Sequence, residues 1–238
     1  MTTTPAPDSQ APVHLDVDAL LFDLDGTLID STEPTERAWN RWGREMGLED
    51  FRYTAHGIPA RSIVADHIEP ERRDEALRRI NELEAADTGG IHRTPGAERV
   101  LASLPAGRWT IVTSCTADLA AARMASAGVA APPLMVTAEQ VDAGKPDPEG
   151  YLLGARRIGA DIRRCLVIED APAGVEAGRA SGAVTLAVSG TFGADALPAT
   201  HVVDSLERVE VSELPSGRLR VTLLPARDGA SAQRGTSA

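Results

Sequence analysis

Apolar segments that alternate with helical stretches dominate the second half of the chain. Beyond residues 94–96 (Thr-Pro-Gly), four apolar segments have the length of buried strands, at 109–113, 134–137, 165–168 and 184–188. The stretches between them, such as 117–127 and 150–158, have helical character. Continuous apolar strands alternating with helices are typical of a parallel sheet that is covered on both faces. The pattern therefore predicts an α/β fold.

A different pattern fills residues 33–91, which are polar and helical and contain no convincing strand. Ala38, Trp39, Trp42 and Met46 recur at helical spacing there. A second apolar stripe runs through the charged stretch 71–86. At roughly 60 residues the block is too long for a simple strand-to-helix connection. It predicts an inserted helical unit.

The first predicted strand ends in two carboxylates. The apolar run that starts at Leu20 leads into Asp23 and Asp25, and Gly26 and Thr27 follow at once. Positions i and i+2 of a strand lie on the same side, so the two carboxylates can converge. Their mutual repulsion and loss of solvation call for a cation, and a divalent metal is the simplest candidate.

Composition narrows the classes of partner. The 238 residues carry a formal net charge of -11 and show no basic patch, which argues against nucleic acid and anionic membranes as partners.

The first ten residues lack the features of a secretory signal, and no apolar run approaches the ~20 residues that span a bilayer. Cys115 and Cys165 are too few for a disulfide framework. We expect a cytoplasmic protein.

The two ends of the sequence are of low complexity. Residues 1–14 are rich in Thr, Pro and Ala and predict a disordered leader. Residues 15–32 and 92–209 are expected to form the α/β core, and 210–238 a C-terminal tail. Within this tail, residues 218–224 alternate like an edge strand, and 226–238 are expected to be disordered.

Polar side chains follow the predicted strands in turn. After the first aspartates come Thr113-Ser114-Cys115, then Lys145 in a Gly-Lys-Pro sequence, then Glu169-Asp170. Ligands of parallel α/β sheets bind at the carboxyl ends of the strands, so these groups are expected at one site. Together they supply carboxylates for attack and proton transfer, a hydroxyl and a lysine. No Ser/His/Asp elbow or Walker loop competes with them.

This ordered set resembles the haloacid dehalogenase superfamily of phosphotransferases. Asp23-Leu24-Asp25-Gly26-Thr27 matches its first motif, Ser114 its second, Lys145 its third and Glu169-Asp170 its fourth. The resemblance extends from about residue 18 to 207 and implies a Rossmann-like core with an α-helical cap at 33–91. Further matches, at residues 39–47, 56–57, 95–97, 111–114 and 169–174, look like the sugar phosphatase and glycerol-3-phosphatase branch.

The resemblance also implies roles. Asp23 is the expected nucleophile. Asp25 is expected to give a proton to the leaving oxygen and then to take one from the water that hydrolyses the intermediate. Lys145 and the Ser114 hydroxyl are expected to neutralise the phosphoryl oxygens together with Mg²⁺. The metal ligands would be Asp23, the backbone carbonyl of Asp25, Asp170 and Glu169.

Several positions keep two interpretations. Thr113 is an alternative to Ser114 as the hydroxyl of the second motif. Glu169 either binds the metal, directly or through water, or contacts the metal ligands without binding the metal itself. Cys115 is expected beside the substrate as a small buried thiol rather than a nucleophile. His56 and Arg61, in a Gly/Pro loop of the cap, are candidates for substrate contacts, and a plain surface loop is the alternative.

The sequence thus predicts a Mg²⁺-dependent phosphatase of small phosphorylated sugars or polyols. A phosphosugar mutase of the β-phosphoglucomutase type is the alternative, and a non-catalytic binding protein is a third hypothesis. Dehalogenase chemistry is disfavoured because that branch lacks the second aspartate, which is present here as Asp25. The expected partner is a small phosphorylated metabolite, and the expected state is a monomer or weak homodimer.

Overall fold

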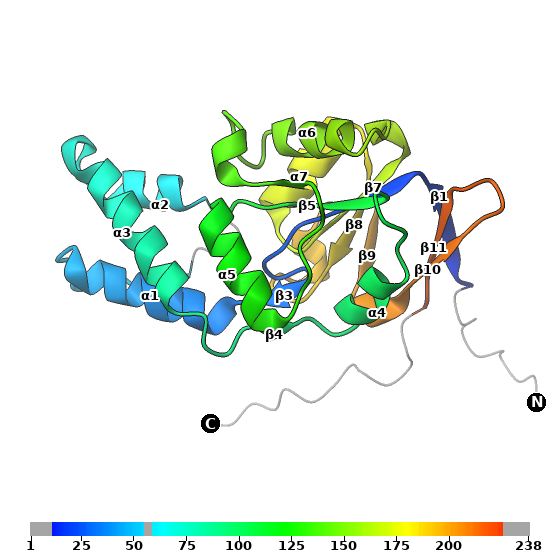
Figure 1. Ribbon diagram of the computed structural model, residues 1–238. Helices are drawn as coiled ribbons and strands as arrows, with labels where there is room; N and C mark the ends of the chain where they lie inside the picture. The colour runs from blue at the N-terminus through cyan, green and yellow to red at the C-terminus, as the bar shows by residue number, and fades with distance from the viewer. Residues whose placement is uncertain (1–10, 55–58, 226–238) are drawn as a thin grey trace, which may run out of the picture.

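A parallel sheet forms the centre of the molecule. The computed structural model describes residues 11–54 and 59–225 (Figure 1). Six strands in these residues form the sheet in the order β6-β5-β2-β7-β8-β9, and each neighbouring pair is parallel. Their bounds are β2 Ala19–Phe22, β5 Trp109–Val112, β6 Met135–Val136, β7 Cys165–Glu169, β8 Val184–Val188 and β9 His201–Val203. The predicted fold class is confirmed.

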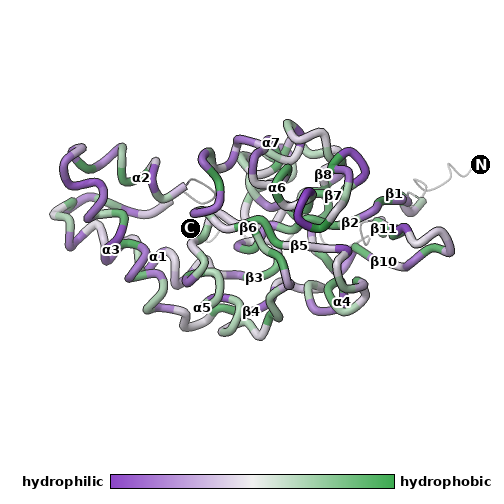
Figure 2. The backbone as a smooth tube through the Cα atoms, turned by 45° about the horizontal axis from the view of Figure 1, so that its top comes forward, coloured by the Kyte–Doolittle hydropathy of each residue, from purple (hydrophilic) through white to green (hydrophobic). Residues whose placement is uncertain are grey.

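Helices cover both faces of this sheet (Figure 1). On one face, Leu20 and Phe22 share a core with Leu119, and on the other Leu21 shares a core with Tyr151. This is the alternation expected of a strand that is buried on both sides. Figure 2 shows hydrophobic positions along β7 and β8. The covering helices are α4 Ala97–Ala102 and α5 Ala117–Ala127 on the first face, and α6 Glu149–Arg157 and α7 Pro172–Ser181 on the second.

A separate layer of helices lies beyond the carboxyl ends of the strands. It consists of α1 Thr32–Glu45, α2 Ala60–His67 and α3 Arg73–Ala86, which we call the cap helices. The paired short strands β3 Ile29–Asp30 and β4 His92–Arg93 join them to the core. Trp39, Trp42 and Ile80 lie in a hydrophobic core of their own, and the Trp42 indole N–H donates to the Ala76 carbonyl at 2.9 Å. The helices fill the block in which a helical insertion was predicted.

The two predicted terminal regions are partly wrong. Strands β1 Val13–Val17, β10 Val209–Glu213 and β11 Leu219–Leu223 form an antiparallel sheet in the order β1-β11-β10, at the end of the molecule away from the cap helices (Figures 1 and 2). The predicted leader therefore includes two residues of β1, and the predicted tail includes β11 and all of β10 except Val209. Leu219 and Val221 are fully buried in the main core, which extends past residue 209.

The strand at 219–223 is also the middle strand rather than an edge strand, because β1 pairs with it from the other end of the sequence. Residues 1–10 and 226–238 lie outside the described part of the chain. Short 3-10 turns complete the fold at 70–72, 138–140, 162–164, 194–196 and 206–208. Within the described ranges, no helix is long and apolar enough to cross a bilayer.

Candidate active site

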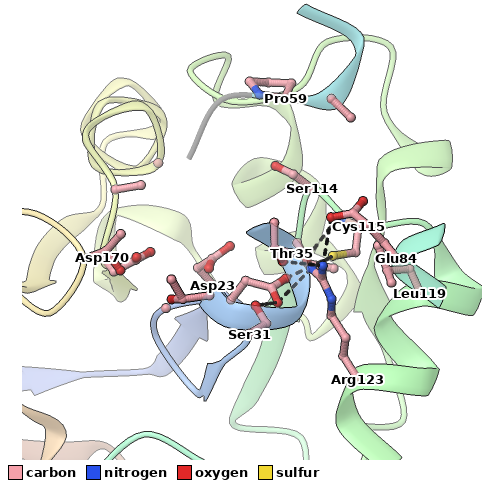
Figure 3. Close-up of a pocket in the computed structure, with 18 of the residues that line it drawn as sticks. Asp23, Ser31, Thr35, Pro59, Glu84, Ser114, Cys115, Leu119, Arg123 and Asp170 are labelled. Carbon is pink, nitrogen blue, oxygen red and sulfur yellow. Dashed lines mark hydrogen bonds and ion pairs between the residues drawn. The ribbon is translucent and has the colours of Figure 1, made fainter. Parts of the chain in front are cut away.

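The carboxyl ends of β5, β2 and β7, which are neighbours in the sheet, meet beneath the cap helices. Asp23 follows β2, and its backbone N–H donates to the Ile168 carbonyl of β7 at 2.9 Å. Ser114 follows β5, whereas Glu169 ends β7. These residues line one cavity together with side chains of α1 and α3, among them Thr35 and Glu84 (Figure 3). The sheet therefore brings the first, second and fourth sequence motifs together.

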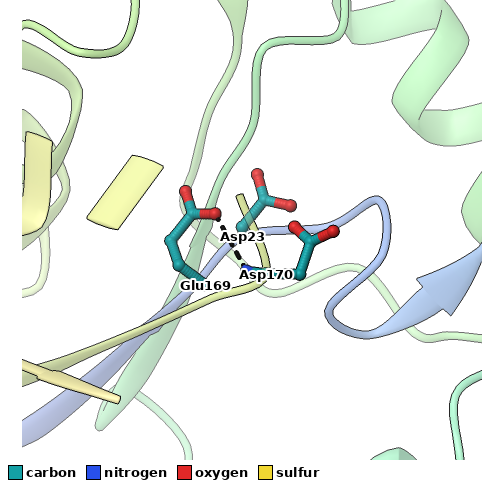
Figure 4. Close-up of side chains that lie close together, drawn as sticks. All are labelled: Asp23, Glu169 and Asp170. Carbon is teal, nitrogen blue, oxygen red and sulfur yellow. Dashed lines mark hydrogen bonds between the residues drawn. The ribbon is translucent and has the colours of Figure 1, made fainter. Parts of the chain in front are cut away.

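An acidic trio lies at the floor of this cavity. Oxygens of Asp23, Glu169 and Asp170 lie within 4.8 Å of one another, and all three side chains are buried (Figure 4). Burial raises the pKa of Asp23 well above its ordinary value, against the opposing effect of Lys145. Burial and the neighbouring Glu169 raise the pKa of Asp170 to about 7. Three carboxylates crowded around one ammonium resist ionising together, and a divalent cation bound among them would favour their ionised forms.

Lys145 joins this trio through its ammonium group. Nζ contacts Asp23 Oδ1 and lies 2.6 Å from Glu169 Oε1. Burial alone would lower the pKa of Lys145, but the two carboxylates raise it overall, so the side chain stays charged. The residue lies on the loop before α6, several residues beyond the end of β6 at Val136, rather than at a strand end as the sequence pattern suggested.

The Glu169 carboxylate is held by donors on both oxygens. Oε1 accepts from the Tyr151 hydroxyl at 2.6 Å as well as from Lys145, and Oε2 accepts from the backbone N–H groups of Asp170 and Ala171 at 3.2 and 3.5 Å. A Cβ at Gly174 would lie 1.8 Å from Oε1, so α7 packs directly against this carboxylate. The position of Glu169, and through it that of Lys145, is tightly constrained.

Gly26 lets the loop after β2 approach Asp170. Its φ of +84° is a conformation that favours glycine, and its N–H donates to the Ile29 carbonyl at 2.7 Å. A Cβ at this position would lie 1.9 Å from Asp170 Oδ2. A side-chain hydrogen bond with Thr191 also holds Asp170. The glycine therefore has a steric as well as a conformational role.

Asp25 faces a different set of groups from Asp23. Its Oδ1 accepts from Ser31 Oγ at 2.6 Å and pairs with Arg123 Nη1 at 2.9 Å, and its Oδ2 lies 3.0 Å from Cys115 Sγ. Burial and the Asp25 charge raise the pKa of Cys115 well above its ordinary value, so this side chain is a thiol. The thiol lines the cavity, and it contacts the predicted proton carrier.

The remaining predicted residues differ in their placement. Ser114 is exposed to the cavity, whereas Thr113 accepts the Cys115 backbone N–H at 3.1 Å, so the geometry favours Ser114 as the substrate-facing hydroxyl (Figure 3). Arg61 lies on α2 and lines an adjoining cavity that Ser114 and Lys145 also line. His56 lies outside the described residues.

The structure adds functional candidates that the sequence analysis did not select, namely Arg123, Glu84 and Tyr151. A signal for two of them was present. Arg123 shares the buried face of α5 with Leu119 and Met124, and Glu84 follows the apolar stripe of α3. A charged residue on the apolar face of a helix requires a buried partner, and these two charges are each other's partners at 3.0 Å.

Clustered carboxylates, a hydroxyl and a lysine at one edge of a parallel sheet are the groups that an enzyme acting on phosphate esters needs. The comparison with protein families agrees with this class. Residues 17–182 match the haloacid dehalogenase-like hydrolases, and the chain belongs to that family. The family predicted from the sequence is thereby confirmed.

Individual relatives narrow the branch. The chain is 43% identical over 206 residues to hexitol phosphatase A of Escherichia coli (strain K12), covering 83% of this chain and 95% of that protein. It is 31% identical over 225 residues to glycerol-1-phosphate phosphohydrolase 1 of Saccharomyces cerevisiae, and the match covers 87% of this chain and 90% of that protein. Among solved structures, a hydrolase from Pseudomonas syringae matches with a TM-score of 0.67 and 26% identity, covering 77% of this chain and 92% of that one. The predicted sugar phosphatase branch is confirmed.

Proposed function

We propose that this protein is a Mg²⁺-dependent phosphatase that hydrolyses small phosphorylated sugars or polyols through an aspartyl phosphate. The observation that carries the proposal is the buried trio of Asp23, Glu169 and Asp170 with Lys145 against it. The names of the two curated relatives, a hexitol phosphatase and a glycerol-1-phosphate phosphohydrolase, support the substrate class. Both are hydrolases, and no contact among the described residues favours a mutase.

In the first step, a carboxylate oxygen of Asp23 attacks phosphorus, and the bond from phosphorus to the ester oxygen breaks. Asp25 gives its proton to that oxygen, so that an alcohol leaves rather than an alkoxide. In the second step, a water molecule attacks phosphorus and passes a proton to Asp25. Inorganic phosphate leaves, and both aspartates return to their starting states. Lys145 and the Ser114 hydroxyl donate to the phosphoryl oxygens throughout.

The acidic trio suits Mg²⁺, which prefers oxygen ligands and would favour the ionised forms of these carboxylates. We propose the side chains of Asp23 and Asp170 and the backbone carbonyl of Asp25 as ligands. The donors on both oxygens of Glu169 favour a role through Lys145, with any contact to the metal made through water. Bound Mg²⁺ would supply positive charge to the phosphoryl oxygens.

The leaving group would occupy the cap side of the cavity, which Trp39, Tyr53 and Asn81 line together with Glu84. This mixture of aromatic faces and polar ends suits a small polyhydroxy compound. The cap helices would keep bulk water away from the aspartyl phosphate, and Arg61 and His56 remain candidates for substrate contacts. We further infer a cytoplasmic enzyme, consistent with two free cysteines, that acts as a monomer or weak homodimer.

Phosphate release from hexitol, hexose, glycerol and glycolate phosphates, with and without Mg²⁺, tests the proposal. We expect Asp23→Asn to lower turnover by at least about 10³-fold, as loss of a nucleophile does. Asp16→Asn is the matched control, because Asp16 pairs with Arg220 on the remote sheet. Turnover by Asp23→Asn at the wild-type rate would contradict the mechanism. Conversion of a sugar 1-phosphate to the 6-phosphate, without phosphate release, would instead indicate a mutase.

A further inference from the structure

One guanidinium group connects the core to the cap helices inside the active-site cavity. Arg123, on α5, is 5% exposed. Its Nη1 lies 2.9 Å from Asp25 Oδ1, while its Nη2 donates to Glu84 Oε1 at 3.0 Å and to Thr35 Oγ1 at 2.8 Å (Figure 3). Asp25 belongs to the core, whereas Thr35 and Glu84 lie on α1 and α3. We call Asp25, Arg123 and Glu84 the Arg123 bridge.

Stability alone gives little reason for such a bridge. Burying an arginine and a glutamate removes both charges from water, and their mutual attraction offsets only part of this desolvation free energy. Proteins with apolar side chains of similar volume in place of such a pair are often as stable. Burial in fact raises the pKa of Glu84, against the lowering effect of Arg123. A planar guanidinium has a different advantage, because it binds two acceptors at fixed angles. The bridge therefore fixes geometry more than it adds stability.

The group that the bridge fixes is the proposed proton carrier. Asp25 lies on the loop after β2, where rotation of its side chain would carry the carboxylate away from the ester oxygen. Ser31 and Cys115 contact the Asp25 carboxylate as neutral donors, and Arg123 adds a charged donor. The Asp25 side chain still keeps 26% of its surface exposed, so that it remains open toward a substrate.

We propose that Arg123 is a positioning residue for Asp25, and that Glu84 of the cap holds Arg123 in the required orientation. The inference rests on the proposed function, because it assigns a supporting residue to the proton transfer of that reaction. It has a mechanical consequence. Displacement of α3 would remove Glu84 from Arg123, so proton transfer is efficient only while the cap helices are seated on the core.

Two substrates separate a positioning role from a structural one. A hexitol phosphate releases an alkoxide that must be protonated, whereas 4-nitrophenyl phosphate releases a stable phenolate that leaves without a proton. For Arg123→Met we expect kcat on the hexitol phosphate to fall by about 10- to 100-fold, part of the roughly 10²- to 10⁴-fold that a positioned proton carrier contributes. KM should change little.

The first turnover of 4-nitrophenyl phosphate should stay within about 3-fold of the wild-type rate, because aspartyl phosphate forms without help from Asp25. Later turnovers should slow, because water must then give a proton to Asp25. Rapid mixing should therefore show a burst of nitrophenolate in Arg123→Met.

Variants of Glu84 and a matched control complete the design. Glu84→Gln keeps an oxygen that can accept from Arg123, so its kcat on the hexitol phosphate should stay within about 3-fold of the wild-type value. Glu84→Ala lacks this oxygen, and its kcat on the same substrate should fall by about 10-fold. Arg79→Met is the control, because Arg79 pairs with Glu45 and joins α3 to α1 without reaching the cavity. It should leave both activities unchanged. Circular dichroism checks that each variant is folded.

Equal losses on both substrates in the first turnover would overturn the inference, as would wild-type rates in folded Arg123→Met. Both results leave the proposed function intact, provided that the wild-type protein releases phosphate from the hexitol phosphate. If it does not, the proposed function fails by itself. A crystal structure of Arg123→Met decides the inference without any assay. A displaced Asp25 carboxylate would support it, and an unmoved one would overturn it.

Discussion

Replacing Gly26 by alanine should disable the site through a steric effect that can be isolated. The new Cβ would lie 1.9 Å from Asp170 Oδ2, whereas ordinary contact begins at 3.4 Å, so the carboxylate would have to retreat by about 1.5 Å. Metal ligands tolerate errors of only about 0.2 Å, and a misplacement of about 1 Å can cost 10²-fold in rate. We expect a loss of about 100-fold or more in kcat/KM, together with a higher Mg²⁺ requirement.

The backbone strain of the same substitution has its own control. Gly47 has a φ of +81°, close to the +84° of Gly26, but a Cβ there would meet nothing within 4 Å. Alanine in this conformation costs about 1–2 kcal/mol at either position. Gly47→Ala should therefore lower the melting temperature by several degrees and leave catalysis unchanged.

The assay is phosphate release titrated with Mg²⁺ for both variants, alongside thermal unfolding. The difference between the two variants measures the displacement of Asp170 with the strain removed. If Gly26→Ala kept the Mg²⁺ dependence and kcat/KM of Gly47→Ala, the close contact between Gly26 and Asp170 would have no functional role, and the reasoning would be refuted.

Two further predictions concern stability. The hydrogen bond from Arg79 lowers the pKa of Glu45 from its ordinary 4.5 to about 2, so the pair stabilises the fold above pH 4.5 and loses this effect as the pH falls toward 2. Arg79→Met should cost up to about 1 kcal/mol at pH 7, and urea unfolding at pH 7 and pH 2.5 should show the difference shrinking; an equal difference at both would contradict the assignment. A chain ending at residue 208 lacks β10 and β11, which exposes the buried Val17 and Leu206, and should melt without a cooperative transition, whereas a chain ending at residue 225 should melt sharply. A sharp wild-type transition in the shorter chain would show that the core ends before β10.

Local patterns predicted the elements on which the site is built. The apolar run ending at Asp23 is β2, and the stretch 117–127 is α5 with the same bounds. The acidic site residues were predicted because they follow predicted strands, and a parallel sheet places the carboxyl ends of its strands at one edge. The parallel topology itself was predicted from the alternation of strands and helices. Lys145 was found from its motif, although it reaches the site from a loop.

Contacts between distant segments were outside the reach of these patterns. Alternation at 219–223 predicts a strand but not its partner, and β1 pairs with it from the opposite end of the sequence. Arg123 was missed for a related reason. Its place on the apolar face of α5 signals a buried partner, but only the tertiary fold shows that Asp25 and Glu84 are its partners. Such residues are identified by their partners, and partners come from the fold.

The pairing of β1 with β11 has a practical consequence for handling the protein. Val13 lies opposite Leu223, so the first and last described segments leave the molecule from one small sheet. This sheet lies at the end of the molecule away from the cap helices (Figure 1), and those helices line the candidate active-site cavity. A reporter joined directly at residue 11 or at residue 225, or a tether to a solid support at either position, would therefore lie away from the cap helices. A short peptide joining residues 11 and 225 would also allow circularly permuted chains to be built.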